Sequence, residues 1–272
     1  MNSLRKNFNE YIQIMDNHDM YNESVINIDS CNFLTPTIIA PLISLMYNYN
    51  KKIKNHENPV VEDYFNKAVG ITKPKDTTLP FRFLDEATDN SEELTKEILN
   101  IIKPAKEETQ ALKYLFHEVI SNVYDHSEFD NGFVIGQTYP TPNITDFSFM
   151  DNGISIPGSL KEFNIPFKND CDAIIKAING ESTKTDPVGY VERGTGLNSV
   201  INIVTRGARG SVLIASGKGL IEINRNRIFS KEIPQDYIKG TLVNLRLHNN
   251  RKIDIYEHMG HVEYVLWIYN WK

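Results

Sequence analysis

The chain has 272 residues, 40% of them hydrophobic, and can bury a sizeable core in one large domain or two small ones. Its net charge of −6 is mild and spread along the sequence, which argues against nucleic-acid binding through neutralised phosphates. No apolar run approaches the roughly 20 residues that cross a bilayer, and the start of the chain lacks a secretory apolar region, so we expect a cytoplasmic protein.

The first elements expected are a strand, a turn and a helix. Residues 24–50 begin with a β-branched run and continue as an apolar stretch too long for one strand. Pro41 fits the helix only within its first turn, because an interior proline removes a hydrogen bond and clashes with the preceding turn. A short amphipathic helix is expected over 60–69.

A loop and another helix follow. Residues 72–80 have the composition of a loop, and the acidic stretch after them leads into a helix that ends before Pro104. Asn90 or Ser91 is the expected N-cap of this helix. We place a domain boundary between about 72 and 105.

The rest of the chain alternates more clearly between helix and strand. A helix over 106–126 precedes strands over 132–139 and 145–150, and an irregular stretch leads to a helix from about 196. Three strand-like runs come last: GSVLIAS, GLIEINR and GTLVNLRLH. Helices set apart from strands that are mostly adjacent in sequence predict an α+β two-layer sandwich.

The helix over 106–126 carries a polar stripe. Glu118, Asn122 and His126 follow each other at intervals of four along the edge of its apolar face, so they stack on successive turns. Side chains at such an edge are partly desolvated and can still reach a ligand in a cleft. On this stretch alone an ordinary polar flank is the better explanation, since E-x-x-x-N is a weak pattern.

Three glycine-bearing turns come after the stripe. Asp-Asn-Gly at 151–153 ends a strand with a carboxylate and leaves room for a flat ligand near the backbone. Arg-Gly-Thr-Gly-Leu at 193–197 opens a helix, where free N–H groups favour an anion. Gly240 and Thr241 open the last strand. Taken alone, the first two are better explained as ordinary turns.

Together the four segments, E-x-x-x-N, D-x-G, R-G-x-G-L and G-T, resemble in this order the Bergerat ATP-binding fold of the GHKL superfamily. The resemblance covers about residues 105–250. It implies that ATP and Mg²⁺ bind beneath a mobile lid formed by residues 158–193. It also implies ATPase activity or transfer of phosphate to a serine or threonine of a partner.

The resemblance assigns roles to the matching residues. Asn122 would be a Mg²⁺ ligand through its side-chain oxygen, since this cation prefers oxygen. Glu118 would be the general base for the attacking water or hydroxyl, and Asp151 would accept a hydrogen bond from the adenine amino group. The other residues implied to bind the nucleotide are Gly153 and Thr241 beside the base, Gly194, Thr195, Gly196 and Leu197 in the phosphate turn, and Lys184 and Arg193 in the lid.

Two further positions bear on the comparison with this family. Ser155 stands where the first glycine box has its second glycine, which we expect to alter lid movement more than adenine binding. His126 matches a histidine that follows this helix in the anti-sigma-factor kinase-like branch, and it is counted with the nucleotide-binding residues on that match alone.

The N-terminal part has a weaker resemblance. INIDSCNFLTPTIIAPLISLM is similar to the strand, turn and helix of STAS-like domains, the antagonist partners of anti-sigma kinases. Thr35 and Thr37 lie near the turn that often holds a phosphorylatable residue in that family, but helix capping is the better explanation for either. His56 lies in a polar break and is a poor candidate for a phosphoacceptor. The expected division is a small α/β STAS-like domain (1–80), a linker and helix (81–104), a GHKL domain (105–250) and a C-terminal extension (251–272).

A fused pair of this kind implies partner-switching signalling. The leading hypothesis is an ATP-binding regulatory protein with ATPase or Ser/Thr-kinase activity, and the alternative is a nucleotide-sensing module without catalysis. The presence of Glu118 favours the enzyme, because a sensor does not need a base. A ligand-free sandwich is a third hypothesis. We expect a protein partner and no nucleic acid, and the aromatic C-terminal residues leave a homodimer open.

Overall fold

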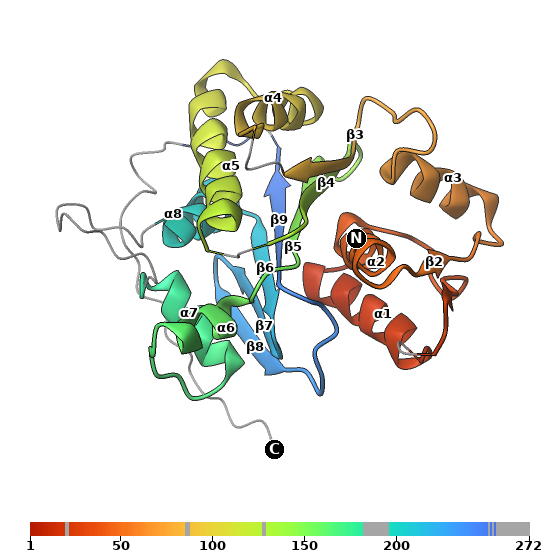
Figure 1. Ribbon diagram of the computed structural model, residues 1–272. Helices are drawn as coiled ribbons and strands as arrows, with labels where there is room; N and C mark the ends of the chain where they lie inside the picture. The colour runs from red at the N-terminus through yellow and green to blue at the C-terminus, as the bar shows by residue number, and fades with distance from the viewer. Residues whose placement is uncertain are drawn as a thin grey trace.

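The fold is described from a computed structural model of the chain (Figure 1). The described residues are 1–19, 22–84, 88–126, 129–181, 196–249, 251 and 253, and the side chains of Asp125 and His126 are not included.

The centre of the protein is a seven-stranded sheet with the order β3-β4-β5-β9-β6-β7-β8. Every neighbouring pair is antiparallel. The strands are β3 (Thr78–Leu84), β4 (Gly132–Tyr139), β5 (Ile144–Asp151), β6 (Ser211–Ser216), β7 (Gly219–Asn224), β8 (Arg227–Glu232) and β9 (Thr241–His248). Because β9 pairs between β5 and β6, the last strand in sequence lies at the middle of the sheet.

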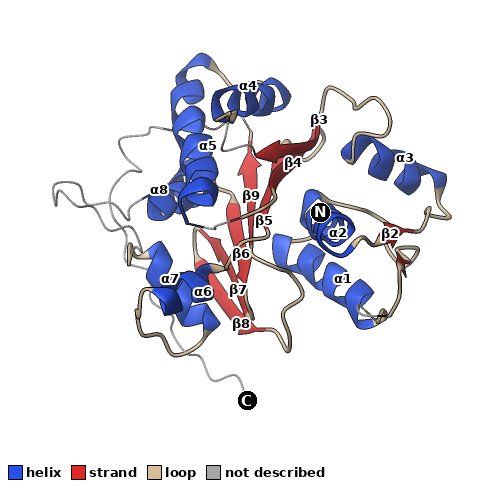
Figure 2. Ribbon diagram, in the orientation of Figure 1, coloured by secondary structure: helices blue, strands red, loops and turns tan. Residues whose placement is uncertain are grey.

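Helices cover both faces of this sheet (Figure 2). One face carries α4 (Ser91–Ile102), α5 (Lys106–His126), α7 (Asp170–Ile178) and α8 (Gly196–Asn202), with α6 (Ile156–Glu162) packed beside α7 and a π-helical turn (Ile203–Gly207) continuing α8. The other face carries α1 (Leu4–Asp16), α2 (Pro36–Tyr49) and α3 (Pro59–Ala68). A separate parallel pair joins β1 (Val25–Ile26) to β2 (Lys52–Ile53).

The α+β class is confirmed, whereas the two-layer arrangement is incomplete because the N-terminal helices form a third layer. Polar side chains on the second face of the sheet suggest exposure to solvent, yet they are buried and paired across neighbouring strands. Asp146 lies opposite Arg246, and the Arg246 guanidinium donates two hydrogen bonds of 2.7 Å to its carboxylate. Ser148 likewise donates to Asn244 on the same pair of strands.

Helix α2 differs from the expectation for Pro41. The helix begins at Pro36, so Pro41 lies in its interior, beyond the first turn. An interior proline costs about 3 kcal/mol. However, Ile38, Ile39 and Leu42 are each completely buried, and each such side chain stabilises the fold by about 1.5–3 kcal/mol. Burial therefore outweighs the break in the hydrogen-bond ladder.

The N-terminal helices share their core with the sheet. Side chains from α1, α2 and α3 belong to the same hydrophobic cluster as sheet residues such as Phe133, Met150 and Leu213. The expected loop over 72–80 ends earlier, because β3 starts at Thr78 and joins the main sheet beside β4. The expected division at residue 80 thus falls inside a strand, and residues 81–104 contain the end of β3 and all of α4.

Candidate functional site

Helix α5 presents Glu118 and Asn122 of the predicted polar stripe to the first residue of α8. Its apolar face is buried as expected, with Phe116 packed edge-on against Phe147 of β5 at 5.0 Å between ring centroids. Glu118 and Asn122 are half-buried beside that face. The two polar side chains are therefore held by a helix whose orientation the core fixes.

The first residue of α8 lies directly against this stripe. A methyl group at Gly196 would collide with the Glu118 carboxylate and would lie 3.8 Å from the Asn122 side-chain oxygen. With a glycine at this position, the Glu118 carboxylate can lie against the backbone of α8 without having to move aside for a side chain. The structure therefore brings together Glu118, Asn122 and Gly196, which the sequence placed in separate segments.

Asn122 has a buried hydrogen-bonding atom without a partner. Its Nδ2 is shielded from solvent and makes no hydrogen bond to any described residue. A buried donor without an acceptor costs about 1–3 kcal/mol. The amide thus has capacity for a ligand next to Glu118 and Gly196.

Asp151 forms a second centre at the end of β5. Its Oδ1 accepts hydrogen bonds from the backbone N–H groups of Gly153 at 2.9 Å and Thr241 at 3.2 Å. Gly240 has a φ of +84°, and a Cβ there would lie 2.6 Å from the same oxygen. Burial raises the pKa of Asp151 to about 7, although the two backbone donors act in the opposite direction.

A serine that the sequence did not single out completes this centre. Ser216, the last residue of β6, is fully buried, and its hydroxyl lies 2.9 Å from that of Thr241. The same oxygen accepts a 2.9 Å hydrogen bond from the N–H of Ile156 at the start of α6. Asp151, Thr241 and Ser216 therefore form a polar cluster where three strands end.

The two centres are connected through β4. Gly132 pairs with Asp151, and a Cβ at Gly132 would lie 3.2 Å from the Val123 side chain of α5. Because Val123 follows Asn122, the last turns of α5 lie over the end of the strand that carries Asp151. The arrangement places a carboxylate and an amide on a helix near a buried carboxylate at the end of an interior strand.

Ser155 adopts the backbone conformation that glycine favours, with φ +67° and ψ 159°. Its side chain accepts a 3.2 Å hydrogen bond from the N–H of Gly158 and so caps α6. A non-glycine residue in this region costs on the order of 1–3 kcal/mol. Residue 155 therefore has the backbone conformation of a glycine, but it is a serine whose hydroxyl stabilises the next helix.

Part of the predicted site lies outside the described residues. Lys184, Arg193, Gly194 and Thr195 belong to that part, as does the His126 side chain. Leu197 is partly buried and packs on the core of the helical layer. Residues 170–178, expected within the lid, instead form α7, whose Ile174 and Ile178 are completely buried. This part of the expected lid therefore belongs to the hydrophobic core. The helical spacing of its apolar residues is the signal that could have predicted α7 from the sequence.

Two other residues beside the site, Tyr114 and Asn152, were not predicted from the sequence. Tyr114 lies one turn before Glu118 on the same stripe, and its pKa is raised by burial and by the Glu118 charge. The spacing of four would have identified it. Asn152 accepts hydrogen bonds from the N–H groups of Asp130 and Asn131 and donates one of 2.8 Å to Asn48 of α2. No local pattern reveals that contact.

The structure gives His56 a structural role and shows no capping bond from the Thr35 hydroxyl. His56 is buried; one ring nitrogen accepts from the Asn58 N–H, and the other lies 2.8 Å from the Cys31 carbonyl oxygen. Both nitrogens are therefore engaged within the protein. Thr35 occupies the N-cap position of α2, but its hydroxyl makes no capping hydrogen bond, so the capping expectation is wrong for this side chain.

Among the described residues there is no group of three or more histidine, cysteine or acidic side chains arranged to hold a metal ion. Nor does any helix in the same residues have the length and apolar composition needed to cross a bilayer. Comparison with models of known protein families gives no match, and a search of curated proteins also finds no similar sequence.

Proposed function

We propose that the chain is an ATP-binding regulatory protein of the GHKL type, which holds Mg-ATP between α5, the start of α8 and the ends of β5, β6 and β9. One observation carries the proposal. Gly196 lies against both Glu118 and Asn122, so three residues that the family pattern requires in one place lie together in this chain.

The residues present fit a bound nucleotide and cation. The Asn122 amide is half-buried with an unpartnered Nδ2, and its side-chain oxygen faces Gly196. In this assignment Nδ2 would donate a hydrogen bond to a phosphate oxygen, and the side-chain oxygen would be the Mg²⁺ ligand. When bound, Mg²⁺ would neutralise charge on the phosphates.

Asp151 is assigned to the adenine ring. Its Oδ1 is already held by the N–H groups of Gly153 and Thr241, which fixes the carboxyl plane and leaves Oδ2 for the adenine amino group. A carboxylate with a pKa near 7 is partly protonated at neutral pH. A donor from the ligand favours its ionised form, so we expect ATP to bind more tightly as pH rises through 7.

Glu118 is assigned as the general base. The carboxylate accepts the proton of the attacking water or hydroxyl as that oxygen bonds to the γ-phosphorus, and the bond to the bridging oxygen of ADP breaks. General bases contribute about 10²–10⁴-fold to rate. With water the reaction is hydrolysis, and with a serine or threonine of a partner protein it is phosphotransfer.

The regulatory part of the proposal rests on α2. Asn48 accepts a 2.8 Å hydrogen bond from Asn152, the residue between Asp151 and Gly153. A partner that binds the N-terminal helices would therefore act on an element in direct contact with the adenine end of the site. This contact supports partner-switching, in which the nucleotide state controls which protein is bound.

The test uses the Glu118→Gln variant with labelled ATP and Mg²⁺. We expect ATP binding within about threefold of the wild type and turnover reduced by about 10²–10⁴-fold. Glu107→Gln, which changes an exposed carboxylate in the first turn of the same helix, is the matched control and should leave both unchanged.

The outcomes separate the hypotheses. Binding without turnover in the wild type, and without phosphate transfer to any protein, would support the alternative of a nucleotide-sensing module. Turnover that is equal in Glu118→Gln and the wild type would refute the assigned base. Failure of the wild-type chain to bind ATP would refute the proposal as a whole.

A further inference from the structure

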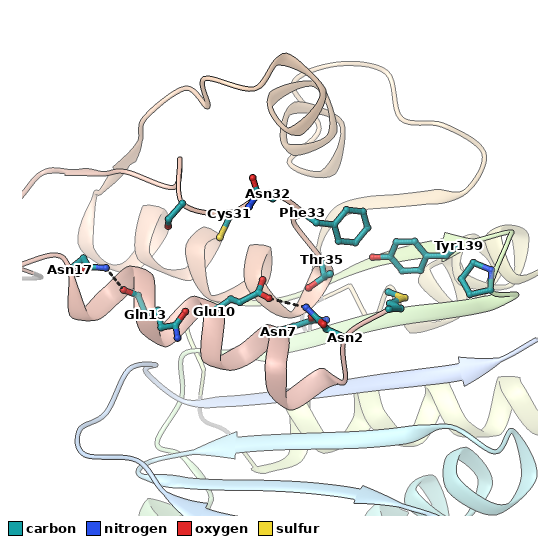
Figure 3. A pocket seen from close by; sticks show the side chains of 13 residues that line it. Asn2, Asn7, Glu10, Gln13, Asn17, Cys31, Asn32, Phe33, Thr35 and Tyr139 are labelled. Atoms are coloured by element: carbon teal, nitrogen blue, oxygen red, sulfur yellow. Dashed lines mark hydrogen bonds between the residues drawn. The ribbon is translucent and has the colours of Figure 1, made fainter.

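A groove of about 870 Å³ lies on the face of the sheet opposite α5 and α8 (Figure 3). It runs between α1 and residues 30–35, the segment that leads into α2, and Tyr139 of β4 closes one end. Its volume is within the range of about 300–1,000 Å³ typical of small-molecule sites. The elements that line it differ from those of the proposed nucleotide site.

The groove is lined mainly by neutral polar side chains. Amides come from Asn2, Asn7 and Asn17, and hydroxyls come from Thr35 and Tyr139. Of the described residues that line it, none has a cationic side chain. Met1, which bears the α-amino group, and Glu10, which bears a carboxylate, are both in the lining, so it carries no net positive charge that would favour an anionic ligand. Amides and hydroxyls both donate and accept hydrogen bonds, which suits a ligand whose groups do the same.

Two of these side chains have unused hydrogen-bonding capacity. Asn7 is 2% exposed and Thr35 is 1% exposed, and neither the Asn7 Nδ2 nor the Thr35 hydroxyl bonds to any described residue. They approach the groove from opposite walls, Asn7 on α1 and Thr35 on the facing segment (Figure 3). Leaving such groups unpaired is costly, so a ligand that pairs with them gains that energy.

An aromatic pair provides an apolar surface beside these amides. The Phe33 ring, 55% exposed, lies 6.0 Å from the Tyr139 ring, measured between centroids, with an interplanar angle of 42°. A ligand that combines hydroxyl groups with a flat C–H face can use both the rings and the polar walls. Glu10, the one carboxylate among the described lining residues, already accepts a 2.9 Å hydrogen bond from Asn2.

We propose that this groove binds a neutral polyhydroxylated small molecule, of the size of a mono- or disaccharide, through Asn7 and Thr35 on its walls and the Phe33 ring at its mouth. The site is separate from the proposed nucleotide site, because the ligand is uncharged and lies on the other side of the sheet.

The test is a titration of the full ¹⁵N-labelled chain, followed through amide chemical shifts. The probes are D-glucose, maltose, N-acetyl-D-glucosamine and myo-inositol, at up to about 10 mM, which populates a site of even millimolar affinity. We expect saturable shifts for at least one probe, concentrated in α1 and residues 30–35. Thr35→Val should weaken that binding about tenfold or more, because a hydroxyl that pairs with the ligand is lost.

Thr37→Val is the matched control. Thr37 is also completely buried and its hydroxyl is also unpaired among the described residues, but it does not line the groove. Both variants should keep or raise the melting temperature, and only Thr35→Val should lose affinity. Phe33→Ala, at an exposed position, should also weaken binding without unfolding the chain. The proposal is overturned by absence of binding for all four probes, or by wild-type affinity in both Thr35→Val and Phe33→Ala.

Discussion

Replacement of Asp151 by asparagine should change stability and nucleotide binding in opposite directions. Burial raises the pKa of this carboxyl from 3.8 to about 7. Because the folded pKa lies above the unfolded one, the stability associated with the protonated carboxyl is complete below about pH 4 and is lost as pH rises through 7. At about 1.4 kcal/mol for each pH unit between the two pKa values, ionisation costs the fold on the order of 4 kcal/mol above that pH.

Asparagine keeps the acceptor atom and removes the charge. Its side-chain oxygen can still accept hydrogen bonds from the N–H groups of Gly153 and Thr241. In urea unfolding, Asp151→Asn should therefore match the wild type near pH 4 and exceed its unfolding free energy by up to about 4 kcal/mol near pH 8. Asp236→Asn, at an exposed position, controls for the loss of one negative charge.

The same substitution should weaken ATP binding. The asparagine NH₂ would face the adenine amino group, donor against donor, and we expect a loss of about 10²-fold in affinity by calorimetry. A difference in unfolding free energy that does not vary with pH would refute the assigned titration of Asp151. Wild-type affinity for ATP in the variant would refute its assignment to adenine.

Three other substitutions test the surroundings of the site and the core. Gly196→Ala places a methyl where the Glu118 carboxylate lies, so that flexible side chain must shift out of the site. Calorimetry should show ATP affinity reduced at least about tenfold, with little change in urea unfolding; unchanged affinity would contradict the assigned contact. Ser155→Gly should raise the free energy of unfolding by about 1 kcal/mol, because glycine relieves the strain of the positive φ. Ser155→Ala should lower it by about 1 kcal/mol, because the helix cap is lost. If urea unfolding shows Ser155→Gly to be the less stable of the two, the cap outweighs the strain. Arg246→Met should lower the free energy of unfolding by about 3–5 kcal/mol, because Asp146 is left buried and unpaired. The double variant Arg246→Met/Asp146→Leu should recover most of that loss. A loss below about 1 kcal/mol in the single variant would show that the fold does not depend on the pair.

Helix α5 and five strands of the main sheet could be predicted from the sequence because their apolar positions have a helical or alternating period. The α5 face predicted from Leu112 to Val123 is the buried one, and strands β4, β5, β6, β7 and β9 lie within one or two residues of their expected limits. The missed strand β8 is mostly exposed at the edge of the sheet, so it has no apolar alternation to detect.

The packing of the N-terminal helices on the second face of the sheet could not be predicted in the same way. Asp146, Ser148 and Arg246 alternate with apolar residues, which is the pattern of a strand with one face in water. Their burial depends on mutual pairing across β5 and β9, which no single segment encodes. The same applies to the site: Glu118 could be proposed from its stripe, but its contact with Gly196 arises only when α8 packs on α5.

The most direct test of the central claim is a titration of the ¹⁵N-labelled chain with Mg-ATP. Saturable amide shifts should concentrate around Glu118 and Asn122 on α5, at Asp151 on β5, at Gly196 on α8 and at Thr241 on β9. The absence of shifts at millimolar Mg-ATP, or shifts confined to the groove beside α1, would contradict the account.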